Sequence, residues 1–362
     1  MSPSTSASPA RRSEATCAHK AQYNSASALA NIRRSNHIIR SEADIPELLP
    51  SLLPALSRSL NIKRVPGGIT NRIFKVSTAT SDPLSVLVRV FGSTEVFTPE
   101  QRETENDVFA QLAHAGIAPR LLAVFGNGRV EQLLDARPIQ LDEMLSDHVC
   151  VGVAKAMAQL HHFRPSGISK EARVWEDIDA WANDALRIEQ KGTLPQHISV
   201  KQCIEWVKSV RIRTDKVVSP IIYAHNDLLC GNILLFENKD VRIIDFEYSS
   251  YNYRGFDIAN FFSECMGGTI DGCVHPDKYP TAEYRKKFCE TYLRERGMTC
   301  DQEAVSNLLN EAAEFDLLTH LYWGLWALVQ SDSSTVDFPY TKFAEARFSE
   351  FCKRFRSIGQ GE

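Results

Sequence analysis

Apolar and polar residues alternate with the period of β-strands in the first third of the chain. Ser85–Phe91 (SVLVRVF) is apolar and β-branched, which is typical of a buried strand. The same pattern predicts strands over residues 61–76 (two strands about a turn), 121–125 and 130–134. Helical spacing precedes the strands at residues 44–60, where prolines interrupt it, and one amphipathic helix is inserted among them at residues 99–116. We therefore expect a small, mostly β unit with one inserted helix.

From about residue 140 the spacing of apolar residues becomes helical. Helices are predicted over residues 141–162, 175–190, 200–214, 256–266, 281–296, 301–331 and 340–356. A compact insert divides them, with short strands over residues 220–224, 232–236 and 241–245. A β-rich lobe, a hinge and a helical lobe that holds a short hairpin follow the order of a protein-kinase-like two-lobed fold of the α+β class. We place the N-lobe at residues 41–135 and the C-lobe at residues 136–362.

Composition narrows the class of partner and the compartment. The net charge of −4 gives no basic footprint, so we expect no nucleic-acid partner. No apolar run reaches the roughly 18 to 20 residues that a membrane helix needs, so we expect no membrane span. Nine scattered cysteines without a metal-binding spacing favour free thiols in a reducing compartment, and hence a cytoplasmic protein.

The first 40 residues differ in composition from the rest of the chain. They are rich in Ser, Ala and Arg, and Glu14 is their only acidic residue. We interpret residues 1–40 as a disordered tail on a cytoplasmic enzyme. A mitochondrial transit peptide is the alternative, because such peptides are also rich in Arg and Ser and poor in acids.

Two elements of the C-lobe carry candidate chemistry for phosphoryl transfer. In HNDLLCGNILL (residues 225–235), Asp227 and Asn232 are five positions apart, which is the spacing of a kinase catalytic loop. Asp227 would accept the proton of an attacking hydroxyl, and Asn232 would bind Mg²⁺ through its amide oxygen. Asp245 ends an apolar strand, where its carboxylate can reach the same metal at the lobe interface. Each element alone is common by chance, but in this order around a hairpin they predict a kinase that uses ATP and Mg²⁺.

The N-lobe supplies weaker candidates for binding the nucleotide. Gly67 and Gly68 lie between two strands, just before Asn71, where backbone amides can approach phosphates without a Cβ in the way. A plain hairpin turn would have the same sequence. Arg89 lies on the apolar strand at the position of the strand lysine of kinases, and we expect a helix acid such as Glu105 to pair with it. A surface arginine at a strand edge is the alternative.

These motifs resemble those of the choline/ethanolamine kinase family. The resemblance rests on HNDLLCGNILL, on IDFEYSSYNYRGFDIANFFSE (residues 244–264) and on HLYWGLWALVQ (residues 320–330), and it covers roughly residues 60–356. It implies a two-lobed kinase that makes phosphoethanolamine or phosphocholine from ATP. The two aspartates and the asparagine named above would be its catalytic and metal-binding set.

The resemblance also assigns residues to ligands. Arg89 would contact a nucleotide phosphate, and Glu131 and Gln132 would lie at the hinge beside adenine. It implies an amine pocket that is lined by Trp323, Trp326, Phe338, Phe343 and Glu264. The two Trp residues share a helix face, where their rings would attract a cation. Without the resemblance, a Trp pair packed in the core is the simpler interpretation.

The identity of the acceptor rests on the residues after Glu264. The animal choline kinases that this chain resembles carry a Tyr there that lines the cage, whereas this chain has CMGGT at residues 265–269. A trimethylammonium group donates no N–H bond, whereas a primary ammonium has three N–H donors and needs oxygen acceptors. We therefore predict an ethanolamine kinase, with a choline or dual choline/ethanolamine kinase as the alternative.

Two alternatives come from other classes of protein. A catalytically inactive kinase fold that acts as a binding module would lack members of the catalytic set, yet all are present. An antibiotic phosphotransferase would need an open, acidic substrate face where this chain has its Trp pair. Because family members often dimerise, a homodimer is a further expectation, although no segment of the sequence requires it.

Overall fold

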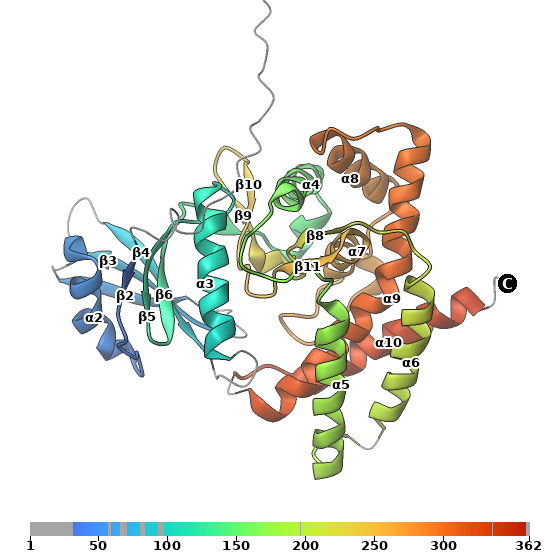
Figure 1. Cartoon of the computed structure of the whole chain (residues 1–362), viewed down its shortest axis with the longest axis horizontal. Helices are drawn as coiled ribbons and strands as arrows, with labels where there is room; N and C mark the ends of the chain where they lie inside the picture. Colours follow the sequence, from blue (N-terminus) through green and yellow to red (C-terminus); the bar gives the residue numbers. More distant parts are fainter. Residues whose placement is uncertain are drawn as a thin grey trace, which may run out of the picture.

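The chain folds into two lobes, a β-rich N-lobe and a larger helical C-lobe (Figure 1). The structure is a computed structural model that describes residues 32–56, 59–65, 71–79, 84–92, 98–195, 197–334 and 336–359. The order of the two lobes along the chain is the order that the sequence predicts.

The N-lobe is built on one six-stranded sheet. Its strands are β1 (Arg33–Arg34), β2 (Leu60–Val65), β3 (Asn71–Thr78), β4 (Ser85–Phe91), β5 (Leu121–Phe125) and β6 (Gly128–Gln132). They lie in the order β1-β5-β6-β4-β3-β2, and every neighbouring pair is antiparallel except β1 and β5. β6 begins two residues before its predicted start, because Gly128 itself belongs to the sheet.

Two helices, α2 (Ile45–Leu52) and α3 (Pro99–His114), cover opposite faces of this sheet (Figure 1). The apolar side of β4 packs with α2 in one buried cluster, while Phe109 of α3 belongs to another. α3 begins where predicted, because the Thr98 side chain accepts a hydrogen bond from the Gln101 amide and Pro99 occupies the first turn. α2 is shorter than predicted and ends before Pro54, where a 3₁₀ turn (Pro54–Leu56) follows.

Residues 32–40 are part of the N-lobe, so the prediction of a disordered tail over residues 1–40 is wrong for this segment. β1 pairs with β5, and Ile39 is buried against the sheet. The Asn127 side chain accepts a hydrogen bond from the Ile39 amide (2.9 Å) and donates one to the Ile39 carbonyl (2.8 Å). Residues 1–31, the rest of the predicted tail, lie outside the described residues.

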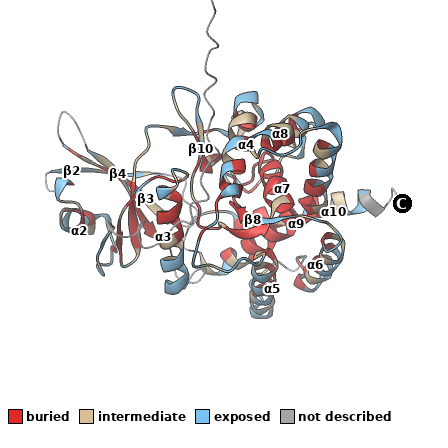
Figure 2. Cartoon of the chain, turned by 45° about the horizontal axis from the view of Figure 1, so that its top comes forward, coloured by how far each residue is buried: buried red, intermediate tan, exposed pale blue. Residues whose placement is uncertain are grey.

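The C-lobe is assembled around one long, buried helix. Its helices are α4 (Asp147–His162), α5 (Val174–Lys191), α6 (Val200–Thr214), α7 (Arg254–Glu264), α8 (Ala282–Glu295), α9 (Gln302–Ser333) and α10 (Tyr340–Gly359). α5, α7 and α10 pack against α9, which is buried around its whole circumference in its middle turns (Figure 2). The predicted helix over residues 141–162 is divided into a 3₁₀ turn (Leu141–Leu145) and α4.

The insert between α6 and α7 places the catalytic segments between the lobes. β9 (Ile233–Leu235) and β10 (Val241–Ile243) form the predicted hairpin, which β7 (Arg137–Pro138) extends. β8 (Ile221–Ala224) pairs with a strand that the sequence analysis missed, β11 (Ser250–Tyr253). The remaining short turns are 3₁₀ turns at Glu42–Asp44, Cys230–Asn232 and Pro276–Lys278. None of the helices in the described ranges is long and apolar enough to cross a membrane.

Candidate active site

Asp257 of α7 holds the loop after β8 in place through hydrogen bonds to its backbone. The fully buried Asp257 carboxylate accepts hydrogen bonds from the backbone amides of His225 (3.0 Å) and Asn226 (2.7 Å), and from the His161 ring (2.9 Å). Burial opposes ionisation, but these donors outweigh it and lower the pKa of Asp257. Asn226 adopts a left-handed conformation (φ 66°), which turns the chain toward the cleft.

His225 supports the same loop and is not among the described residues that line the cleft. Its Nε2 bonds to the Ile244 carbonyl (2.9 Å), just before Asp245, and its ring packs on Phe246. Burial lowers the pKa of His225 to about 4, so the ring is neutral near pH 7. The histidine therefore ties the catalytic loop to the strand end that carries Asp245.

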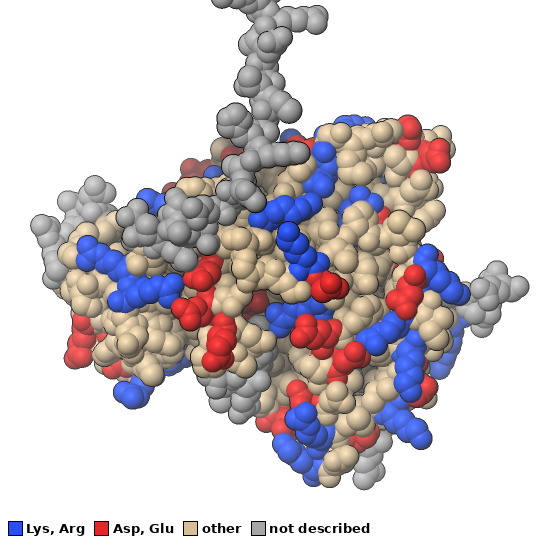
Figure 3. All heavy atoms as spheres, in the orientation of Figure 1, with Lys and Arg blue, Asp and Glu red and all other residues tan. Residues whose placement is uncertain are grey.

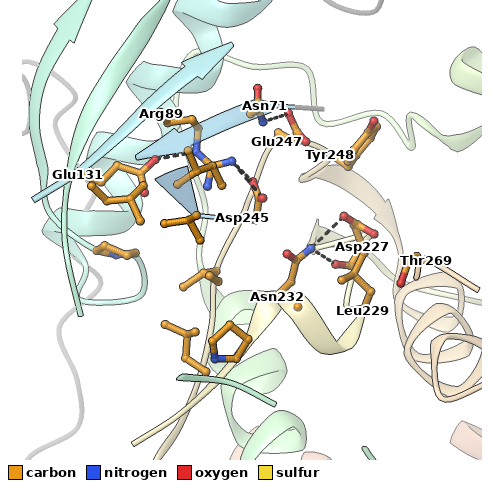
Figure 4. A pocket seen from close by; sticks show the side chains of 18 of the residues that line it. Asn71, Arg89, Glu131, Asp227, Leu229, Asn232, Asp245, Glu247, Tyr248 and Thr269 are labelled. Carbon is orange, nitrogen blue, oxygen red and sulfur yellow. Dashed lines mark hydrogen bonds and ion pairs between the residues drawn. The ribbon is translucent and has the colours of Figure 1, made fainter. Parts of the chain in front are cut away.

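Asp227 and Asn232 lie side by side at the floor of the cleft (Figure 4). The Asn232 side-chain amide donates to Oδ2 of Asp227 (3.0 Å) and to the Asp227 carbonyl (2.8 Å). Burial raises the pKa of Asp227 well above its ordinary value, and the negative charges of Glu264, Asp245 and Glu247 add to this effect. The five-residue spacing in the sequence thus brings the two predicted side chains into direct contact.

Asp245 meets Arg89 of the N-lobe across the cleft (Figure 4). Arg89 is nearly completely buried, and its Nη1 donates to both carboxylate oxygens of Asp245 (3.0 and 3.1 Å). Its Nε donates to Glu131 on β6 (3.0 Å). Burial favours the neutral guanidine, but the two carboxylates outweigh it and raise the pKa of Arg89. Arg89 is therefore a charged group of the interior and not a surface arginine.

The expected pair between Arg89 and Glu105 is wrong. The register of β4 and β6 places Arg89 opposite a second buried arginine, Arg129, and Glu131 bridges the two. Glu105 instead bonds to Arg129 (2.6 Å) and Arg102 (2.7 Å), and it lines a second cavity between α3 and the C-lobe. The sequence analysis missed Arg129, because its cross-strand position depends on the register.

These contacts form a series of alternating charges that begins in the C-lobe, passes through the N-lobe and ends in the C-lobe. Arg102 also donates to Glu247 (3.2 Å), which lies two residues after Asp245 in the C-lobe. Glu247 in turn accepts a bond from the Asn71 side chain (3.1 Å). We call this set the charge chain; its members in order are Asp245, Arg89, Glu131, Arg129, Glu105, Arg102 and Glu247. Figure 3 shows charges of both signs interspersed on the outer surface, whereas most of the charge chain is buried.

The oxygen ligands at the cleft fit a Mg²⁺ ion that is shared with phosphates. The described residues contain no group of three His, Cys, Asp or Glu side chains that could hold a metal by themselves. Mg²⁺ is commonly bound by one or two protein oxygens together with substrate phosphates and water. Because the Asn232 amide nitrogen faces Asp227, its amide oxygen points to the side of Asp245 (Figure 4). Asn232 and Asp245 are therefore suited to hold the ion jointly.

One cavity of about 400 Å³ joins the nucleotide candidates to the amine candidates. At one end, apolar side chains from both lobes flank Gln132, which ends β6 at the connection between the lobes. At the other end lie Tyr248, Glu264, Thr269, Trp323, Trp326 and Phe343. Asp227 lines the same cavity, and Figure 4 shows it between Arg89 and Asp245 on one side and Thr269 on the other. The arrangement can hold a nucleotide and a small acceptor with the catalytic carboxylate between them.

The aromatic side of the acceptor end is fixed by hydrogen bonds. The indole N–H of Trp323 donates to Asn260 (2.7 Å), and that of Trp326 donates to the Tyr248 hydroxyl (2.8 Å). The rings of Trp323 and Trp326 are 5.4 Å apart and nearly perpendicular. The sequence left open whether these Trp residues line a pocket or pack in the core. They do both, because they are buried core residues and also line the cavity.

The structure brings most of the predicted site residues together, with some exceptions. Asn71 and Phe343 line the cavity, whereas Phe338 packs behind Phe343 (5.9 Å between rings) and is not among the described lining residues. Gly67 and Gly68 lie outside the described residues. The sequence analysis did not predict that Tyr248 and Thr269 line the cavity, although it had quoted the segments that contain them, residues 244–264 and 265–269.

The fold and the catalytic loop define a kinase-like phosphotransferase. A family model described as choline/ethanolamine kinase matches residues 62–352. A probable ethanolamine kinase from Arabidopsis thaliana is 32% identical and covers 88% of this chain and 89% of its own length. A choline/ethanolamine kinase from Homo sapiens is 31% identical, over 83% and 81% of the two chains. Among solved structures, a choline kinase from Cryptosporidium parvum Iowa II is similar at a TM-score of 0.76 and 26% identity, over 89% of this chain and 97% of that one.

The chain therefore belongs to the choline/ethanolamine kinase family. The predicted family, the two-lobed α+β kinase-like fold and the assignment as a kinase are confirmed.

Proposed function

We propose that this protein transfers the γ-phosphate of ATP to the hydroxyl of ethanolamine, with Mg²⁺ as cofactor. The observation that carries the proposal is the single cavity in which Asp227 lies between a cleft of paired charges and a pocket of aromatic rings. The similar proteins from Arabidopsis thaliana and Homo sapiens are named probable ethanolamine kinase and choline/ethanolamine kinase, which supports an amino alcohol as acceptor.

Each catalytic residue has one role in this reaction. Asp227 accepts the proton of the acceptor hydroxyl while the hydroxyl oxygen bonds to the γ-phosphorus and the bond to the bridging oxygen of ADP breaks. Asn232 and Asp245 would hold Mg²⁺, which neutralises phosphate charge when it is bound. Arg89 lines the same cavity and would face a phosphate of the nucleotide.

The ammonium group of the acceptor binds at the aromatic end of the cavity. The rings of Tyr248, Trp323 and Trp326 attract a cation through their faces, and the buried Glu264 supplies a negative charge. A choline or dual-specificity kinase is the second candidate, because the same rings would also enclose a trimethylammonium group. Glu264 and Thr269 favour ethanolamine, since they offer oxygens to N–H donors.

The acceptor preference is tested by the kcat/KM of the purified protein with ethanolamine and with choline at saturating ATP. We expect ethanolamine to have the higher value, and a tenfold preference for choline would contradict the proposal. Asp227→Asn, which keeps the shape of the side chain, should lower kcat roughly 10²- to 10⁴-fold. Asp240→Asn, in the exposed hairpin turn of the same insert, is the control that should leave kcat unchanged. Undiminished turnover in Asp227→Asn would contradict the mechanism.

We also propose that the protein acts in the cytoplasm as a homodimer. Eight described cysteines are free, which fits a reducing compartment. Light scattering coupled to gel filtration measures the mass in solution, and fractionation of cells measures the compartment.

A further inference from the structure

The acceptor end of the cavity contains a buried carboxylate that the catalytic loop does not use. Glu264, the last residue of α7, is 2% exposed, and its Oε1 accepts a hydrogen bond from Nη2 of Arg347 on α10. The other oxygen, Oε2, is buried and has no hydrogen-bond partner within the described part of the chain. Because an unsatisfied buried acceptor is unfavourable by about 1–3 kcal/mol, a ligand that brings a donor would gain from it.

Arg347 holds this carboxylate in place and favours its charged form. The arginine is fully buried, and its guanidinium lies 4.9 Å from the ring centre of Phe343, a residue of the cavity wall. Its Nε and Nη1 have no partners among the described residues, so Glu264 is the anion that balances its charge there. Burial raises the pKa of Glu264, and the charge of Arg347 opposes that rise.

The loop after α7 brings a hydroxyl to the same end of the cavity. Gly267 and Gly268 have φ angles of 72° and 117°, which favour glycine strongly. A Cβ on Gly268 would lie 2.5 Å from Cε2 of Phe343, so the backbone packs directly on that ring. The residue that follows, Thr269, lines the cavity on the side of Asp227 (Figure 4).

We propose that Glu264 and Thr269, with Arg347 as the anchor of Glu264, form a polar end that binds the N–H groups of the acceptor ammonium. Oε2 of Glu264 accepts one N–H and the Thr269 hydroxyl accepts another, while the aromatic rings enclose the carbon atoms. Each N-methyl group replaces a donor by a group that cannot satisfy these oxygens. The pocket therefore ranks acceptors by the number of N–H bonds they donate. Thr269 determines specificity and Arg347 is a positioning residue; this inference rests on the proposed function.

The first experiment measures the kcat/KM of the full-length protein with ethanolamine, N-methylethanolamine, N,N-dimethylethanolamine and choline. We expect little change for the first methyl group, because N-methylethanolamine still has two N–H donors for the two acceptors, and a fall of roughly three- to tenfold for each of the next two methyl groups. A flat series, or one that rises toward choline, would overturn the inference.

The second experiment uses Thr269→Val, which removes the hydroxyl at nearly constant volume. The KM for ethanolamine should rise about tenfold while kcat and the KM for choline stay nearly constant, so that the selectivity falls about tenfold. Thr269→Ser, which keeps the hydroxyl, should retain most of the selectivity. If Thr269→Val changes both acceptors equally, the hydroxyl does not discriminate between them.

The third experiment separates positioning by Arg347 from its contribution to stability. Arg347→Lys keeps the charge but loses the geometry of the guanidinium, and it should raise the KM for ethanolamine more than that for choline. The matched control is Arg354→Lys on the same helix, which bonds to Asp316 (2.7 Å) and Glu350 (2.8 Å) and does not line the cavity. The control should lower thermal stability without changing the ratio of the two KM values. Equal effects of both variants on that ratio would refute a positioning role.

These outcomes distinguish this inference from the proposed function. If the wild-type protein phosphorylates none of the four amino alcohols, the proposed function fails. If it phosphorylates them and Thr269→Val keeps the wild-type selectivity, only the polar end is wrong.

Discussion

The two ends of the cavity handle charge in different ways. At the nucleotide end, the charged groups are already paired with one another, as Arg89 is with Asp245 and Glu131. At the acceptor end, one oxygen of Glu264 remains without a donor among the described residues, within a wall of aromatic rings. If the proposed function holds, a nucleotide with its metal would exchange existing ion pairs for new ones, whereas an ammonium group would add a donor to the unpaired oxygen.

The two ends also differ in the lobes that build them. The charge chain joins β4, β6 and α3 of the N-lobe to residues 245–247 of the C-lobe, so it links the proposed nucleotide site to the placement of the lobes. The acceptor end is made by α7, α9 and α10 with the segments that follow α7 and Asp245, all within the C-lobe. Changes in the charge chain should alter ATP use, and changes in the ring wall should alter acceptor use.

The largest effect is expected from Arg89→Met, which removes the central cation of the paired charges at the proposed nucleotide end. The change leaves the carboxylates of Asp245 and Glu131 without a shared cation, which should lower the free energy of unfolding by about 3–5 kcal/mol. The KM for ATP should rise strongly, and turnover should fall. Urea denaturation and steady-state kinetics measure the two effects.

Arg89→Lys is the control for that variant, since it keeps the charge but cannot bond to both carboxylates as a fork. It should lie between wild type and Arg89→Met in stability and in the KM for ATP. An unchanged KM for ATP in both variants would contradict the assignment of this end to the nucleotide.

A smaller effect is expected from Trp326→Phe, at the acceptor end. The variant loses the indole bond to Tyr248 and part of the ring wall, which should lower stability by about 2 kcal/mol. The KM for the acceptor should rise several-fold, and the KM for ATP should stay constant. Trp206→Phe, which packs on Phe351 away from the cavity, is the matched control and should leave both KM values constant. A larger change in the KM for ATP than in that for the acceptor would mean that the two ends are not separate.

A third effect concerns His225, which supports the loop that both ends share. Its folded-state pKa of about 4 lies below the ordinary value of 6.5, so the unfolded chain gains a proton first as the pH falls. The free energy of unfolding should therefore decrease between pH 6.5 and about pH 4, by up to about 1.4 kcal/mol per pH unit. Urea denaturation at several pH values measures this slope, and His225→Gln, which cannot titrate, should reduce it. Identical slopes in the two proteins would show that His225 does not contribute.

The smallest effect is expected from Arg34→Met, which removes two exposed ion pairs of the N-lobe. Arg34 contacts Glu103 (3.4 Å) and Asp107 (3.2 Å) at the surface, where water screens the charges. Thermal denaturation should show a loss below about 1 kcal/mol, and both KM values should stay constant. A loss as large as that of Arg89→Met would mean that burial is not what makes the charge chain important.

Local sequence patterns predicted most elements and the contact between the two candidate residues of the catalytic loop. The helix over residues 200–214 has the predicted bounds, because its apolar spacing and the Ser199 cap are local signals. Asp227 and Asn232 come into contact because five residues of one loop separate them. These features need no information about distant parts of the chain.

Features that depend on distant partners could not be predicted in the same way. The register between β4 and β6 places Arg129 directly opposite Arg89. Glu131 on β6 is therefore within reach of both arginines and is the partner that they share. β10 ends at Ile243, and Asp245, two residues later, has a left-handed conformation (φ 67°). The apolar run in the sequence predicted a strand that continues to Asp245, so this change of backbone conformation was not foreseen. The role of Thr269 depends on how two glycines pack on Phe343, a contact between distant segments.

The pairing of β1 with β5 has a consequence for the order in which the chain folds during its synthesis. β1 leaves the ribosome before every other described strand, yet Arg33 pairs with Ala123, about 90 residues later. The edge of β5 stays open until β1 returns to it, and Ile39 is held only after the turn at Asn127 has formed. The earliest described segment to be translated is thus among the last that can join the N-lobe.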